Sequence, residues 1–364
     1  MAPSLDPIAA LSQQLEEFFT GQRAHASQFG AEARMLVDAA AGAVSGGKRL
    51  RARFCLAGWQ SVAEHAGQTG GPGLAVIGAA AALEVFHAAA LVHDDIIDNS
   101  DTRRGHSSAH RSLQALHEQR GWDGESVAFG RAGGILLGDL LVALSDDLLE
   151  TALQSLPSQL AGPARAQYAT MRRDVTIGQF LDVAEESAHI TVPDHEHAAR
   201  ALQVASLKSA RYSVEQPLLI GARLAGADQE QLASLSAFGQ PVGMAFQLRD
   251  DVLGVFGDAD VTGKPAGDDL REGKRTVLVA YAREALPAGA RRSLDELIGD
   301  PELDDAQIEM LRRTIADSGA LSRVEDLIEE YVRAADRALA GAPLGNAAVG
   351  RLRDLARAAA VRAA

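Results

Sequence analysis

The sequence predicts an all-α protein, a single-domain bundle of helices. Apolar residues make up 47% of its 364 residues but aromatic residues only 4%, so the core must be built mainly from Ala, Leu and Val. That composition favours closely packed helices over a sheet. Helical stretches alternate with short breakers, among them Ser45-Gly46-Gly47 and Leu156-Pro157-Ser158. No run of alternating β-branched residues is long enough to propose a sheet, and no linker divides the chain.

The expected elements follow from the order of apolar and breaking residues. Residues 1–30 form an N-terminal segment and the start of the first amphipathic helix, and residues 31–364 form the main domain. Residues 78–98 make a nearly continuous apolar helix, which belongs inside the protein. Two further helices of this kind are expected at 205–224 and 235–255, a long functional loop at 258–276, and a terminal amphipathic helix from 346 to the end.

Charge and cysteine content limit the classes of function. The formal net charge of -14 argues against a general nucleic-acid binder, which would carry a basic excess. The single cysteine, Cys55, excludes an internal disulfide and fits a reducing compartment. Neither a secretory signal nor an uninterrupted apolar span of ~18 residues is visible, so we expect a cytoplasmic protein without a transmembrane segment.

Two aspartate pairs are the most informative feature of the chain. His93-Asp94-Asp95-Ile96-Ile97-Asp98 and Asp250-Asp251 lie far apart, and both lie inside apolar helical runs. Carboxylates buried together would take up protons unless divalent cations held them ionised. Asp94 and Asp98 lie one turn apart on the same helix face, so they can share a cation such as Mg²⁺. The pairs therefore predict a helical cavity that holds a polyphosphate through metal ions.

Cationic residues near these pairs predict anion sites. Arg103 and Arg104 follow the first pair, and guanidinium groups bind phosphate, although a salt bridge within a helix is the alternative. Lys48 and Arg51 follow a glycine turn near a helix start, which is a second candidate anion site. His87 lies two turns before Asp94 on the same face; the alternative is a structural buried histidine. Lys208, Lys264 and Lys274 add cations in the second half, and the two loop lysines could instead be solvated charges.

In this order the motifs resemble those of the trans-isoprenyl diphosphate synthases, or polyprenyl synthetases, and most of all geranylgeranyl diphosphate synthases. The resemblance runs from about Gly46 to Thr276. It rests on Gly46-Gly47-Lys48-Arg49, Glu84-Val85-Phe86-His87, both aspartate motifs, Arg103-Arg104-Gly105, Gly178-Gln179 with Asp182, Lys208-Ser209, Phe246-Gln247 and Gly263-Lys264-Pro265.

The resemblance implies an isoprenoid synthase fold, a helical bundle around a deep central cavity, in a homodimer. It implies head-to-tail condensation of isopentenyl diphosphate with an allylic diphosphate (dimethylallyl, geranyl or farnesyl), with release of pyrophosphate. By likeness Asp94, Asp95, Asp98, Asp250 and Asp251 hold Mg²⁺ against the allylic diphosphate, as three ions per site or with Mn²⁺ instead. Arg103, Lys208, Gln247 and Lys264 would bind the same group, Lys48, Arg51, His87 and Arg104 would bind isopentenyl diphosphate, and Gln179 and Ser209 would face the reacting carbons.

Three positions depart from the family pattern or leave it ambiguous. Gly254 stands where many relatives carry a third aspartate, so one metal would have fewer carboxylate ligands. Ser209 stands where threonine is usual and keeps the hydroxyl. The pair Asp268-Asp269 leaves open which residue matches the family's loop aspartate, and the spacing to Lys274 favours Asp269.

Chain length is predicted from the helix before the first aspartates. Ala90 lies one turn before Asp94, so a growing tail could slide past it, and Phe86, one turn further, is the nearest large side chain that could form a floor. Ala89 joins this set by resemblance alone. We expect geranylgeranyl diphosphate (C20) as product, with longer polyprenyl or farnesyl products as alternatives. A class I terpene cyclase and a noncatalytic partner subunit are the other candidate functions.

Overall fold

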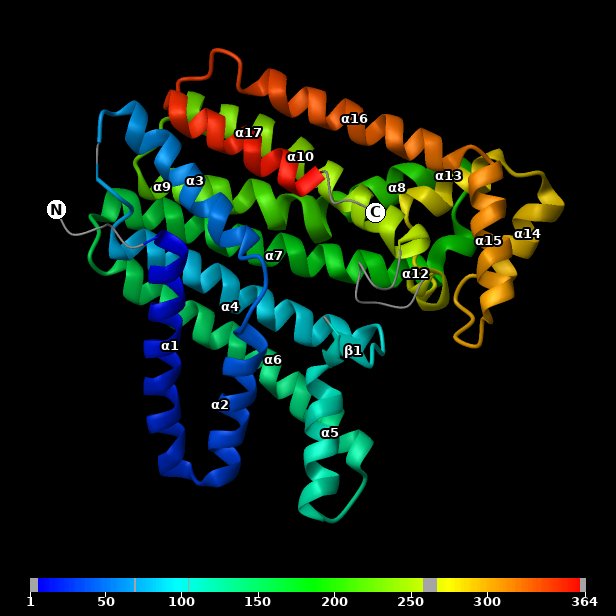
Figure 1. The fold of residues 1–364 in the computed structure, drawn as a ribbon, viewed down its shortest axis with the longest axis horizontal. Helices are drawn as coiled ribbons and strands as arrows, with labels where there is room; N and C mark the ends of the chain where they lie inside the picture. Colours follow the sequence, from blue (N-terminus) through cyan, green and yellow to red (C-terminus); the bar gives the residue numbers. More distant parts are fainter. Residues whose placement is uncertain (1–5, 69, 104, 258–266, 361–364) are drawn as a thin grey trace. The chain divides into compact units, whose positions relative to one another are not determined.

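The computed structural model describes residues 6–68, 70–103, 105–257 and 267–360. These residues are almost entirely helical, which confirms the all-α prediction (Figure 1). The one sheet among them is a two-stranded antiparallel ribbon, β1 (Thr102–Arg103) and β2 (His106–Ser107). Its strands are too short to leave a recognisable alternation of residue types in the sequence. The chain divides into two compact units, residues 1–165 with 221–226, and residues 166–220 with 227–364.

The first unit is built around α4 (Leu74–Ile97), whose residues from Ala79 to Val85 are almost fully buried. Figure 1 shows α6 (Ser126–Leu153) lying beside α4. Gly78 permits this approach, because a Cβ at that position would overlap Ala152 of α6. The remaining elements are α1 (Pro7–Ala26), η1 (Ser27–Phe29), α2 (Ala31–Val44), α3 (Leu50–His65), the ribbon, α5 (Ala109–Arg120) and the start of α7 (Ser158–Ala188).

The second unit is centred on α10 (Gln229–Phe256), which packs against α16 (Ala320–Ala338) and the π-helix η4 (Ala205–Glu215). Its core includes the fully buried side chains of Leu248, Leu270 and Val324. The other elements are the rest of α7, η2 (His189–Thr191), η3 (Asp194–Glu196), α8 (His197–Val204), the first part of α9 (Gln216–Leu224, whose residues 221–224 belong to the first unit), α12 (Asp268–Glu272), α13 (Val277–Ala285), α14 (Ala288–Leu297), α15 (Asp305–Asp317) and α17 (Asn346–Ala360).

The helix expected from 78 begins earlier, at Leu74, and three further predicted elements differ from the structure. The helix expected at 205–224 begins as a π-helix and becomes α-helical only at Gln216. The helix expected from 235 starts at Gln229, where Asp228 and Gln231 form a capping box. The expected loop 258–276 contains a short helix at Asp268–Glu272, and its residues 258–266 lie outside the described ranges.

Among the described residues, two helices are long and apolar enough to cross a membrane, but buried core helices share these properties. In α4 the most apolar window is 78% buried within the protein, as expected of a core helix. In α6 the corresponding window is only 33% buried. Leu137, Leu141 and Leu144 of α6 are buried, whereas Ile135 and Leu136 are exposed.

Candidate active site

The first aspartate motif lies at the carboxyl end of α4, in the first unit. Asp95 is buried, whereas Asp94 and the C-cap residue Asp98 are half-buried. His87, Ala90, Asp94 and Asp98 recur at helical spacing, and each is incompletely covered. The helix therefore presents one partly open face that carries the residues predicted to share it. Phe86 and Ala89 are buried.

Arg103 of β1 pairs with this motif. Its Nε donates to Asp95 Oδ1 at 2.7 Å, and its Nη2 lies 3.5 Å from Asp94 Oδ2. The ribbon brings the guanidinium back over the end of α4, since Ser108 N–H donates to the Asp101 carbonyl at the base of the ribbon. The salt bridge thus joins two elements rather than two turns of one helix. Arg104 lies outside the described residues.

The segment with Lys48 is a tight turn held by a buried carboxylate. Gly46, Gly47 and Arg49 all have positive φ, at 70°, 79° and 52°, which explains the two glycines. Glu84 of α4 accepts a hydrogen bond from the Ala52 N–H at 3.0 Å, and its other oxygen lies 3.6 Å from Arg49 Nη1.

The carboxylate of Glu84 therefore caps the amino end of α3 from a neighbouring helix. His87 lies one turn along the same helix, while Lys48 is exposed and Arg51 half-buried. Sequence reasoning used Glu84 only as part of a motif and assigned it no function. The sequence signal that could have identified Glu84 is the presence of a charged residue inside an otherwise apolar helix.

The second aspartate motif lies near the carboxyl end of α10, in the second unit. Asp250 is half-buried, and the buried Asp251 accepts a hydrogen bond from Gln247 Nε2 at 2.7 Å. Burial raises the pKa of the Asp251 carboxyl to about 8. The charge of Asp269 is the next cause, ahead of Asp250 and Asp182, and the Gln247 hydrogen bond acts against them.

Asp269 occupies the space next to Gly254. A Cβ placed on Gly254 would overlap the Asp269 carboxylate, so a larger residue there would have to displace it. The Lys274 N–H donates to the Asp269 carbonyl at 3.0 Å, and Lys274 Nζ lies 3.9 Å from its carboxylate and 2.5 Å from Glu272. Asp269 rather than Asp268 thus lies beside the second motif. It adds a carboxylate where the sequence lacks the third aspartate.

Lys208 and Ser209 lie in the π-helix η4, and both are half-buried. Lys208 Nζ pairs with Asp182 of α7 at 2.5 Å. Gly178 of α7 packs directly on the Lys208 backbone, where a Cβ would not fit. π-helical turns are rare and frequent at functional sites, and no local residue pattern predicted this one. Gln179 is half-buried on α7, and Lys264 lies outside the described residues.

The chain is similar to known proteins both in sequence and in structure. The sequence model of the family described as polyprenyl synthetase matches residues 33–315. The chain belongs to the polyprenyl synthetase family. This polyprenyl synthetase is therefore a prenyltransferase of the isoprenyl diphosphate synthase class.

Two sequence relatives and one solved structure illustrate the likeness. A geranylfarnesyl diphosphate synthase of Aeropyrum pernix is 33% identical over 266 residues, 72% of this chain and 75% of that protein. A geranylgeranyl diphosphate synthase of Sulfolobus acidocaldarius is 32% identical over 256 residues, 70% of each chain. The crystal structure of geranylgeranyl pyrophosphate synthase from Corynebacterium glutamicum, complexed with isoprenyl diphosphate and magnesium, superposes with a TM-score of 0.91 at 33% identity over 98% of each chain.

The donor set of this polyprenyl synthetase fits Mg²⁺. The aspartate motifs offer oxygen ligands, and the like charges crowded around Asp251 are what a divalent cation offsets. Within the described ranges, no three His, Cys, Asp or Glu side chains are gathered as ligands of one ion. Mg²⁺ in phosphate sites is usually bound by one or two carboxylates, with water and substrate oxygens completing its shell.

Proposed function

We propose that this polyprenyl synthetase condenses an allylic diphosphate with isopentenyl diphosphate, head to tail, and releases pyrophosphate. The product is a trans-prenyl diphosphate, geranylgeranyl diphosphate. The observation that carries the proposal is the presence of two aspartate motifs with cations nearby: Arg103 pairs with Asp94 and Asp95 in the first unit, and in the second unit Lys208 pairs with Asp182, whose charge acts on Asp251. The family match and the names of the relatives support it.

Binding of the allylic diphosphate is assigned to the aspartates and their cations. Asp94, Asp95, Asp98, Asp250 and Asp251 hold Mg²⁺ in this proposal, and Asp269 joins the second set. When bound, Mg²⁺ supplies positive charge that offsets the charge developing on the leaving pyrophosphate. Arg103 and Lys208 stabilise the same charge as the allylic C–O bond breaks, and Gln247 and Lys264 complete the set.

Isopentenyl diphosphate is assigned to Lys48, Arg51, His87 and Arg104. Holding its diphosphate places its double bond against the allylic cation, and orientation of this kind lowers the barrier by removing the entropy of encounter. Gln179 and Ser209 face the reacting carbons. Apolar side chains exclude water, which would otherwise trap the cation as an alcohol. The proton is then lost to the released pyrophosphate.

The twenty-carbon product is supported by the partly open face of α4. Ala90 is small and half-buried one turn before Asp94, and Phe86 is buried one turn further on. A tail that starts at the first motif would pass Ala90 before it met Phe86, ~12 Å from the aspartate by helix rise.

We propose a homodimer in the cytoplasm. The support for a dimer is the apolar face of α6, where Ile135 and Leu136 are 48% and 60% exposed. Exposed apolar patches on single helices mark interaction surfaces. Cys55 is fully buried, and burial raises the pKa of its thiol to about 12, so it is an unreactive thiol that suits a reducing compartment.

One assay tests the function. Purified protein is incubated with isopentenyl diphosphate, Mg²⁺ and each of dimethylallyl, geranyl and farnesyl diphosphate, and the dephosphorylated products are separated by chain length. Consumption of both substrates, loss of turnover with EDTA and a twenty-carbon product are expected. A cyclic hydrocarbon formed from the allylic diphosphate alone would identify a class I terpene cyclase. No consumption of either substrate would identify a noncatalytic subunit.

A further inference from the structure

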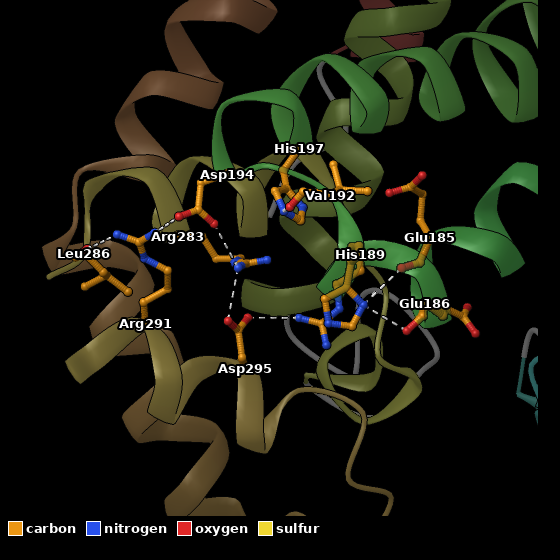
Figure 2. A network of polar contacts seen from close by, with 11 residues as sticks. Glu185, Glu186, His189, Val192, Asp194, His197, Arg283, Leu286, Arg291 and Asp295 are labelled. Carbon is orange, nitrogen blue, oxygen red and sulfur yellow. Dashed lines mark hydrogen bonds and ion pairs between the residues drawn. The ribbon is translucent and has the colours of Figure 1, made fainter. Parts of the chain in front are cut away.

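A network of arginines and aspartates lies in the second unit, outside the residues assigned to substrate (Figure 2). Asp295 of α14 lies 3.3 Å from Arg275 Nη1 and 3.2 Å from Arg283 Nη2, one carboxylate oxygen to each. Arg283 also approaches Asp194 at 3.4 Å, and Arg291 pairs with Asp194. The carboxylate of Asp295 therefore joins α14 to α13 and to the residue immediately before Thr276, the N-cap of α13.

Two buried histidines border the same network. His189 Nδ1 donates to the Glu185 and Glu186 carbonyls at 3.1 and 3.0 Å, at the end of α7. His197 Nε2 donates to the Val192 carbonyl at 3.2 Å. Burial lowers the pKa of both imidazoles, and Arg275 beside His189 and Arg283 beside His197 lower it further. Neutral histidines therefore pack against the guanidinium groups without adding to their charge.

The network is costly to bury. Arg275 and Arg283 are 9% and 11% exposed at their side chains. Nε of Arg275, Nε and Nη1 of Arg283 and Nε of Arg291 are buried without a hydrogen-bond partner. Buried donors without partners cost free energy, and apolar replacements of buried ion pairs are often neutral or stabilising. Stability is therefore a poor explanation for this network, and positional control is a better one.

The segment that the network fastens carries functional groups. Arg275 directly follows Lys274, whose backbone N–H is bonded to Asp269. On the other side of α12, the Gly299 N–H donates to the Leu270 carbonyl at 2.8 Å. The carboxylate of Asp269 fills the space beside Gly254, one helical turn after Asp251. One peptide unit joins Arg275 to Lys274, and the backbone hydrogen bond from Lys274 to the Asp269 carbonyl joins both to the carboxylate beside the second motif.

We propose that Asp295 is a positioning residue for the second aspartate motif. By holding Arg275 it fixes Lys274 and Asp269 against Asp251 and so sets the affinity for a diphosphate and its Mg²⁺. This inference rests on the proposed function, which assigns Asp251 and Asp269 to the allylic diphosphate and its Mg²⁺, and it adds Lys274 beside them. Asp295 itself touches no substrate.

The test compares Asp295→Asn with two reference variants. Asp295→Asn keeps the side-chain volume and removes the charge, whereas Asp295→Glu keeps the charge and should restore much of the effect. Asp336→Asn is the matched control, because Asp336 of the same unit pairs with Arg353 at 2.7 Å on an exposed surface. For Asp295→Asn we expect KM for the allylic diphosphate and the Mg²⁺ requirement to rise on the order of tenfold, as for other residues that orient metal ligands. KM for isopentenyl diphosphate should stay within about twofold, since its assigned residues lie outside this network.

A double-mutant cycle and a binding measurement complete the test. In an Arg275→Ala background Asp295→Asn should add little to the rise in KM, because its effect passes through Arg275. Calorimetric titration with inorganic pyrophosphate and Mg²⁺ should show the same loss of affinity without any turnover. If both KM values change equally while Tm falls, or if the two substitutions are additive, Asp295 is merely structural and the proposal is wrong. Failure of the wild-type protein to condense its substrates would instead overturn the proposed function.

Discussion

Asp251 illustrates how a proposed metal ligand is kept in an unfavourable environment. Its carboxylate is buried, accepts one hydrogen bond from Gln247 and is repelled by Asp269, Asp250 and Asp182. A group of this kind is satisfied only when a proton or a cation occupies the site. Folding therefore buries this proposed metal ligand at the expense of stability.

The pH dependence of stability should reveal this conflict. Because the folded pKa of Asp251, about 8, exceeds its ordinary value of 3.8, the folded state holds a proton that the unfolded state has lost between these pH values. The contribution of Asp251 to stability is therefore full below about pH 4 and declines as the pH rises towards 8. In EDTA, Asp251→Asn should remove this decline and raise Tm at pH 8 relative to the wild type. Thermal unfolding at pH 5 and pH 8 measures it, and an unchanged pH profile would contradict the assignment.

Loss of a single motif aspartate should abolish condensation. Asp94→Ala and Asp250→Ala each remove a proposed metal ligand, so turnover should fall by roughly a hundredfold or more, while the fold survives or gains stability through relieved repulsion. The control is Asp101→Ala, since Asp101 is exposed and pairs with Arg111. Turnover under saturating Mg²⁺ and thermal unfolding are measured together. Near wild-type turnover in either variant would refute the metal assignment.

At the scale of elements, α4 links the two predicted substrate groups. Its carboxyl end carries the first aspartate motif, and Glu84, ten residues before Asp94, anchors the amino end of α3 behind the Lys48 turn. A buried carboxylate that satisfies both a helix terminus and a guanidinium is a strong local constraint. The separation of the two cation groups along one rigid helix suits two substrates that must be held a fixed distance apart.

Glu84→Gln should mainly weaken isopentenyl diphosphate. The amide keeps an oxygen for Ala52 N–H but loses the charge that holds Arg49, so the Lys48 turn should shift and KM for isopentenyl diphosphate should rise roughly 10- to 100-fold. Lys48→Ala and Arg51→Ala should share this phenotype, whereas Arg103→Ala should raise KM for the allylic substrate. Glu150→Gln, which disrupts an exposed pair with Arg165, is the control. Equal effects on both Michaelis constants would refute the division into two groups.

The chain length of the prenyl product should depend on α4. If Phe86 forms the floor beneath Ala90, Phe86→Ala should extend the product beyond twenty carbons. Because Phe86 is buried, the substitution should also cost about 3–5 kcal/mol of stability, so the assay is run well below the variant's Tm. Chain-length analysis of the products decides the matter. An unchanged product distribution would place the stop on another helix.

At the scale of the whole molecule, the exposed apolar residues Ile135 and Leu136 of α6 predict an interface with another chain. The proposed occupant is a second copy of the chain, and Leu136→Glu should convert the dimer to a monomer by burying a charge at the interface. Leu74→Glu is the control, because Leu74 is 85% exposed at the start of α4 and away from this face. Analytical ultracentrifugation of the three proteins gives the mass. A wild-type monomer, or a dimer that survives Leu136→Glu, would contradict the proposal.

The sequence by itself determined the all-α fold class, the aspartate motifs and the spacing that puts His87, Ala90, Asp94 and Asp98 on one helix face. Helical periodicity and burial of apolar runs are local properties, so they can be read from neighbouring residues. The roles implied by the resemblance rest on motifs that are visible in the sequence. The substitutions of Asp94, Asp250, Lys48 and Arg103 test those roles. The π-helical turn at 205–215 was less accessible, because it depends on detailed geometry, whereas the start at Gln229 follows an Asp228–Gln231 capping box whose residues stand in the sequence.

Only the tertiary structure decided which distant residues meet. Asp269 fills the space beside Gly254, Glu84 holds Arg49 across 35 positions of the chain, and Asp194 pairs with Arg291, 97 residues away. None of these contacts follows from spacing, because each depends on how helices pack rather than on how one helix turns. The energy of a buried carboxylate or guanidinium depends on the same packing, since burial and neighbouring charges set its cost. The sequence therefore shows which charged residues the chain carries, but only the folded structure shows which of them interact.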